Sequence, residues 1–250
     1  MPERRIPDTA LKREAFAQQS GIPSGAPLFY GPEAGPPLYR RQILWYISVC
    51  GRKPAGSEKK ERYTMLTLER AKELNDSMVT EEHLRIHALN VMASMGAMAE
   101  HFGEDREHWE AVGYLHDYDY EKYPEEHLQH TKEPLLAAGV PEEDVRAIMA
   151  HGYDICTDVK PETNMEKSLY AVDELTGIIQ AYARMRPEGI HDIKVSSFMK
   201  KFKDKRFAAK CDRELIRKGC AMLGMEVRDV AEICIKGMEA HAAEIGLDGE

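Results

Sequence analysis

Beyond residue 64, apolar residues recur at helical spacing, and this pattern limits the fold more than any other feature. Within residues 80–103, four side chains at intervals of three or four share one helix face: Leu84, His87, Val91 and Met95. No run in this part of the sequence alternates like a half-buried strand. We therefore expect an all-α fold, a compact orthogonal helical bundle over residues 65–250.

The breaks in the pattern predict where individual helices begin and end. We expect Thr80 to cap the helix that starts there and Gly103 to end it. Pro124 and Gly139 are expected to bound a later helix, and Pro141 to stand in the first turn of the next. The remaining helices are expected over 64–75, 104–116, 141–151 and 164–187, with two or three more within 195–245.

The first 64 residues differ in composition from the rest. They contain 8 of the 13 prolines, which remove backbone donors and block helices. We expect residues 1–64 to form a mostly irregular, basic extension, with at most a short strand or helix at 41–50. The apolar run 43–50 is too short to span a membrane, so no membrane partner is expected.

Composition narrows the class of protein. A chain of 250 residues with 43% hydrophobic residues can bury a core, and a net charge of -9 makes nucleic acid an unlikely partner. The five cysteines show no C-x-x-C spacing, so we expect free thiols in a reducing, cytoplasmic setting. Nothing in the sequence indicates an oligomeric state.

Histidines cluster in the middle of the chain: eight of the ten lie between positions 83 and 151. His87 falls on an apolar helix face, and His116 and Asp117 are adjacent in GYLHDYDYEKYPEEH, residues 113–127. Asp173 lies between Val172 and Leu175 on a mostly apolar helix, where an unpaired carboxylate is costly. A divalent cation would remove this cost, and so would an arginine or a helix N-terminus.

Adjacent helical residues point about 100° apart, so His116 and Asp117 can reach one metal only where their helix ends. The run DYDYEKYP, closed by Pro124, predicts such an end. Imidazole and carboxylate ligands suit Mn, Fe, Co, Ni or Zn, and Mg less well. The alternatives are an ordinary polar helix end and a core histidine.

The pattern H…HD…D in these helices resembles the HD superfamily of metal-dependent phosphohydrolases. The resemblance includes AIMAHGYDICTDVKPE, LYAVDELTG and FMKKFKDKRFAA, and covers roughly residues 65–245. It implies that His87, His116, Asp117 and Asp173 bind a divalent metal. It also implies that Asp117 bridges to a second metal if further histidines are present. The candidates for these histidines are His127 and His151, and His127 is preferred to His130.

The same resemblance implies hydrolysis of a phosphate ester, a nucleotide or a small phosphomonoester, by a metal-activated water. Asp119 is expected to take the proton or to orient a ligand, and the alternative is that it is simply an exposed acid. Basic residues gather over positions 200–210. Of these, Lys200, Lys203 and Lys205 either belong to a solvated helix face or hold the substrate phosphate.

Two other functions remain open from the sequence. Four histidines and two aspartates would also suit a diiron oxygenase on the same fold. A non-catalytic module that binds a nucleotide is the other alternative.

Overall fold

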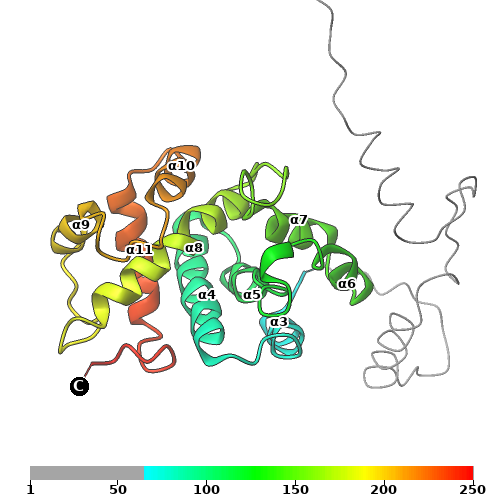
Figure 1. The fold of residues 1–250 in the computed structure, drawn as a ribbon, viewed down its shortest axis with the longest axis horizontal. Helices are drawn as coiled ribbons and strands as arrows, with labels where there is room; N and C mark the ends of the chain where they lie inside the picture. The colour runs from blue at the N-terminus through cyan, green and yellow to red at the C-terminus, as the bar shows by residue number, and fades with distance from the viewer. Residues whose placement is uncertain (1–64, 250) are drawn as a thin grey trace, which may run out of the picture. The chain divides into compact units, whose positions relative to one another are not determined.

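The computed structural model describes residues 65–249, which fold into α-helices joined by turns and longer loops (Figure 1). The α-helices are α3 (Leu68–Asp76), α4 (Glu82–Phe102), α5 (Arg106–Leu115), α6 (Lys132–Ala137), α7 (Glu142–Ala150), α8 (Asn164–Ala183), α9 (Val195–Lys203), α10 (Arg213–Leu223) and α11 (Val227–Glu239). A 3₁₀ helix, η1 (Pro124–Glu126), follows α5. The described residues contain no strand, so the predicted all-α class is confirmed. The predictions for residues 1–64 lie outside the described residues.

Helix α4 lies at the centre of the bundle. It packs against α5, α8 and α11, while α8 also contacts α7 and α10. Figure 1 shows α3, α5, α6 and α7 on one side of α4, and α9, α10 and α11 on the other. Met92, Met95 and Met98 of α4 are buried and fill the core around the helix. No helix among residues 65–249 is long and apolar enough to cross a membrane.

The predicted helix from Pro124 to Gly139 is wrong in its first half. The chain forms only η1 there, and α6 begins at Lys132. The cause is Asp119, whose carboxylate accepts hydrogen bonds from the backbone N–H groups of Leu128 and His130, at 3.0 Å each. Leu128 adopts a left-handed backbone conformation, with φ of 67°, which a helix cannot include.

The segment before α3 is joined to α5 and α7 by a buried carboxylate. Asp144 on α7 is fully buried, and its Oδ2 accepts a hydrogen bond from the backbone N–H of Leu66 at 3.2 Å. Its Oδ1 lies 2.6 Å from Nε2 of His108 on α5. This hydrogen bond raises the pKa of His108 against the opposing effect of burial.

We expect His108→Ala to lower the stability of the fold by an amount that depends on pH. A histidine whose pKa is raised on folding contributes stability that is complete below its unfolded pKa, about 6.5, and is lost as pH rises through the folded value. Urea unfolding at pH 6 should therefore show a deficit of about 1–3 kcal/mol, and unfolding at pH 9 a smaller one. An equal deficit at both pH values would contradict a charged His108–Asp144 pair.

Candidate metal centre

Four of the predicted ligands meet at the crossing of three helices. His87 belongs to α4 and Asp173 to α8, and His116 and Asp117 directly follow the last residue of α5. Nε2 of His87 lies 3.1 Å from Nε2 of His116 and 3.0 Å from Oδ1 of Asp173. Oδ2 of Asp117 lies 3.3 Å from Nε2 of His116 and 3.5 Å from Nε2 of His87. We call these residues the four-residue group.

Two more histidines stand on the other side of Asp117. His127 follows η1 and His151 follows α7, and their Nε2 atoms are 3.1 Å apart. Oδ1 of Asp117 lies 3.4 Å from Nε2 of His127 and 3.6 Å from Nε2 of His151. These distances define a three-residue group of Asp117, His127 and His151. Asp117 therefore faces each group with a different carboxylate oxygen, as a bridging ligand does.

The end of α5 explains how two adjacent residues reach one centre. The helix stops at Leu115, one residue before the predicted end at 116, and a series of turns carries the chain to Tyr123. Glu121 in these turns accepts hydrogen bonds from the backbone N–H of Thr80 at 2.6 Å and of Glu81 at 2.9 Å. Thr80 is therefore not the N-cap that the sequence predicts, and α4 starts one residue later, with Glu81 as its cap. The carboxylate of Glu121 fixes these turns against the start of the helix that carries His87.

Three of the four imidazoles are oriented by hydrogen bonds at Nδ1. Nδ1 of His116 donates to the carbonyl oxygen of Gly113 at 2.8 Å, and Nδ1 of His151 to that of Ile148 at 2.6 Å. Nδ1 of His127 lies 2.9 Å from Oδ1 of Asp119. Carbonyl and carboxylate oxygens can only accept, so each of these rings, in its neutral form, carries its lone pair on Nε2, toward the centre. Facing lone pairs 3.1 Å apart, at His127 and His151, favour a cation between them.

The electrostatics of the cluster also suit a cation. Burial acts to raise the pKa of Asp117 and of Asp173, but the adjoining imidazoles outweigh it and lower both pKa values. At His116, burial acts to lower the pKa, and the two carboxylates raise it well above its usual value. Both carboxylates are therefore ionised at neutral pH, which is the state that binds metal.

Asp119 contacts the Nδ1 side of the His127 ring, away from the Nε2 atom that faces Asp117 and His151. Its side chain is fully buried, and it accepts hydrogen bonds from the His127 ring and two backbone N–H groups. Burial acts to raise the pKa of Asp119, but these hydrogen bonds outweigh it and lower the pKa. A carboxylate with a lowered pKa and both oxygens engaged is a poor proton acceptor. This geometry favours the orienting role among the two that the sequence leaves open.

We expect Asp119→Asn to weaken metal binding by about 10- to 100-fold, the usual cost of losing a carboxylate that orients a metal-binding histidine. Titration of the protein with Mn²⁺, followed by calorimetry, measures this loss. Glu126→Gln is the matched control, because the side chain of Glu126 is exposed and pairs at 2.6 Å with His130, which belongs to neither group. Equal affinities in the two variants would show that Asp119 does not position His127.

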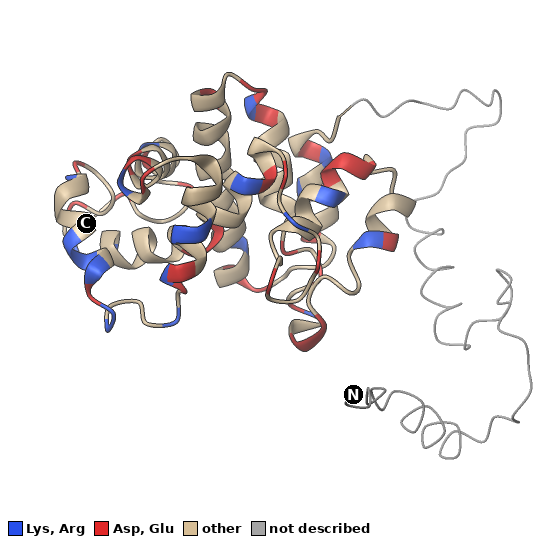
Figure 2. Ribbon diagram, turned by 90° about the horizontal axis from the view of Figure 1, so that it is seen from above, with Lys and Arg blue, Asp and Glu red and all other residues tan. Residues whose placement is uncertain are grey.

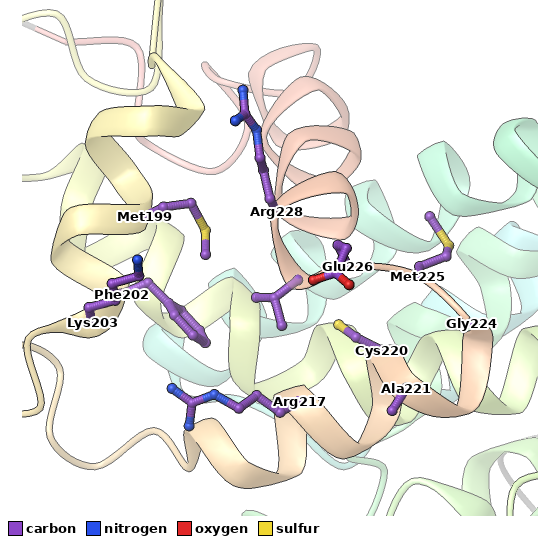
Figure 3. Close-up of a pocket in the computed structure, with 11 residues that line it drawn as sticks. Met199, Phe202, Lys203, Arg217, Cys220, Ala221, Gly224, Met225, Glu226 and Arg228 are labelled. Atoms are coloured by element: carbon purple, nitrogen blue, oxygen red, sulfur yellow. The ribbon is translucent and has the colours of Figure 1, made fainter.

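The predicted phosphate-binding lysines are not brought to this cluster. Lys200, Lys203 and Lys205 are exposed, on and just after α9, which packs against α8 and α11. Figure 2 shows basic residues gathered at the end of the bundle where α9 lies. Lys203 lines a different pocket of about 630 Å³, between α9, α10 and α11, together with Phe202 and Arg217 (Figure 3).

Comparison with known families identifies the fold around the cluster. The family model for the HD domain matches residues 84–197, which include both groups of candidate ligands. Residues 84–197 are therefore similar to an HD domain. The resemblance predicted from the sequence is confirmed over these residues. Comparisons with curated proteins and with solved structures give no match.

The HD domain belongs to a superfamily of metal-dependent hydrolases, and HD domains typically bind divalent metals. The donor set fits such metals, because it offers four imidazole nitrogens and two carboxylates with no thiolate. The predicted ligands His87, His116, Asp117, His127, His151 and Asp173 would hold them.

Proposed function

We propose that this HD domain hydrolyses a phosphate ester, a nucleotide or a small phosphomonoester, at two divalent cations that share Asp117. The observation that supports the proposal is the placement of Asp117, with one oxygen toward each group of histidines. Metal pairs about 4 Å apart, held by a shared ligand, suit displacement at phosphorus because they stabilise both the attacking and the leaving oxygen.

Some residues of this chain would bind the cations, and others keep those binding residues in the right orientation. His87, His116 and Asp173 would hold one cation, and His127 and His151 the other. The Gly113 and Ile148 carbonyls and the Asp119 carboxylate keep three rings in the tautomer that leaves Nε2 free to bind. When bound, the cations supply a water of lowered pKa and neutralise charge on the phosphoryl oxygens.

Access for a substrate comes from the side where the ligands are not covered. The side chains of His87, Asp117 and Asp173 keep 26%, 18% and 25% of their surface exposed, whereas His116 is fully buried. The exposed ligands surround the first position, so a phosphoryl group can reach it without a movement of the helices. His116, which is fully buried, lies on the covered side of this position.

The test is phosphate release from a panel of nucleotides and small phosphomonoesters. The protein is stripped with a chelator and loaded in turn with Mn, Mg, Co, Ni or Zn, and the metal content of each sample is measured. Turnover that requires metal supports the proposal. Metal binding without phosphate release from any compound contradicts it.

A second candidate is a diiron oxygenase, which the same six-ligand set with a bridging carboxylate favours. Loading with Fe²⁺ under argon and then admitting oxygen separates the two candidates. Oxygen uptake that is stimulated by an organic substrate, with no phosphate release under any metal, would replace the hydrolase with the oxygenase.

A further inference from the structure

A lysine from outside the matched HD segment lies beside two tyrosines next to the metal centre. Lys218 belongs to α10, and its ammonium lies 4.6 Å from the ring centre of Tyr153 and 5.8 Å from that of Tyr170. It pairs with the carboxylate of Asp154, and 40% of its side chain is exposed. Lys218 is therefore a cation on the surface, held in place by two rings.

The two rings place Lys218 near the metal ligands. Tyr153 comes two residues after His151. Tyr170 comes three residues before Asp173 on α8, which is about one turn, or roughly 4.5 Å along the axis. Helix α10 approaches α8 closely at this level, because a Cβ at Gly219 would lie 2.7 Å from Cα of Ala171. Both rings that contact the ammonium therefore belong to residues one turn or less along the chain from a candidate ligand, Tyr153 from His151 and Tyr170 from Asp173.

The ion pair of Lys218 can be exchanged for another anion. Asp154 keeps 51% of its side chain exposed, and exposed ion pairs contribute little stability. The rings of Tyr153 and Tyr170 fix the lysine by contacts that do not involve Asp154. An incoming anion can therefore replace the carboxylate without moving the ammonium.

We propose that Lys218 binds a second anionic group of the substrate, a carboxylate or a further phosphate, beside the phosphate that the metals hold. This inference rests on the proposed function and narrows it to substrates with two anionic groups. Asp154 then acts as an internal competitor that occupies the lysine until substrate arrives.

The competing interpretation is structural. In this interpretation, the ion pair of Lys218 and Asp154 stabilises the turn after α7, so that replacing either residue weakens ligand binding in the same way. Competition predicts opposite effects: Lys218→Met should weaken binding of a two-anion ligand, and Asp154→Asn should strengthen it. Asparagine tolerates the left-handed conformation of residue 154, where φ is 62°, so this variant should fold.

The experiment is calorimetric binding of non-hydrolysable probes to the full chain loaded with Mn²⁺. The probes are carboxyalkyl phosphonates with one to four methylene groups, each compared with the alkyl phosphonate of equal length. We expect the best carboxylate probe to lose about 10- to 100-fold in affinity in Lys218→Met, since the bond is charge-assisted, and the alkyl probe to lose less than about threefold. Lys218→Arg should keep most of the affinity, and Asp154→Asn should increase it.

The failures of the two proposals look different. If alkyl phosphonates bind but a carboxylate adds nothing, or if Lys218→Met and Asp154→Asn weaken binding alike, the role of Lys218 is overturned. If no phosphonate binds the metal-loaded protein, phosphate recognition itself is overturned, and the role of Lys218 with it. Unchanged melting temperatures and metal content in both variants exclude misfolding as the cause.

Discussion

Asp117→Ala should abolish phosphate release and lower the metal content of the protein, while its helicity stays almost unchanged. The carboxylate of Asp117 has one oxygen toward each group of histidines, so its loss would remove a proposed ligand from both positions at once. Catalysis by metal ions contributes several kcal/mol, and we therefore expect turnover to fall by about 10³-fold or more. Circular dichroism, metal analysis and phosphate release on the same sample measure the three quantities.

Asp158→Ala is the matched control for this variant. Asp158 lies in the turn region between α7 and α8 and is exposed, so it should retain full metal content and full turnover. Retained activity in Asp117→Ala would refute the metal centre as the source of the activity. Loss of helicity in that variant would instead assign Asp117 a role in folding.

Arg213→Met should lower the melting temperature strongly without removing metal ligands. The side chain of Arg213 lies at the start of α10, is 8% exposed, and donates to five backbone carbonyl groups. The acceptors are the carbonyl oxygens of Phe202, Asp204, Phe207, Ala208 and Cys211. Methionine fills the space but leaves these buried acceptors unpaired, so we expect a loss of about 3–5 kcal/mol. In a domain of this size, that corresponds to roughly 6–20 °C in the melting temperature.

Arg206→Met in the same segment serves as the control, since the side chain of Arg206 is 95% exposed and its melting temperature should not change. Arg213→Lys should be intermediate, because an ammonium has fewer donors and lacks the planar fork of the guanidinium. Equal melting temperatures for Arg213→Met and the wild type would show that the carbonyls are satisfied without the guanidinium.

Helical spacing and breaker residues predicted the bundle and most helix ends correctly. Gly103 ends α4, and α5 ends beside His116 as the candidate site requires. The helix predicted from Pro124 failed because a distant carboxylate, Asp119, captures the backbone N–H groups that the helix would have used. Local spacing cannot reveal such a bond, since it depends on how the turns after α5 fold back.

The candidate ligands could be predicted from the sequence, whereas the position of Lys218 could not. Histidines on apolar faces and a carboxylate inside an apolar helix are chemically conspicuous, so His87 and Asp173 could be singled out. The density of basic residues made Lys203 a candidate for phosphate binding, yet this lysine lies on an exposed helix face. Lys218 sits in the ordinary amphipathic segment RELIRKG, where nothing local separates it from Arg217. Only the packing of α10 on α8 places it beside Tyr153 and Tyr170.

Gly113 connects the packing of the core to bond lengths at the metal centre. A Cβ at this position would lie 3.0 Å from Cγ of Met95 and 3.2 Å from Cα of Met92, so α5 rests directly on the backbone of α4. The carbonyl of the same residue holds the ring of His116, opposite His87 on α4. One methyl group here would push the helices apart by tenths of an ångström, which is as much as a metal–ligand bond tolerates. The close approach of α4 and α5 at Gly113 therefore fixes the distance between the rings of His87 and His116, and with it the size of the cation that the two rings would hold.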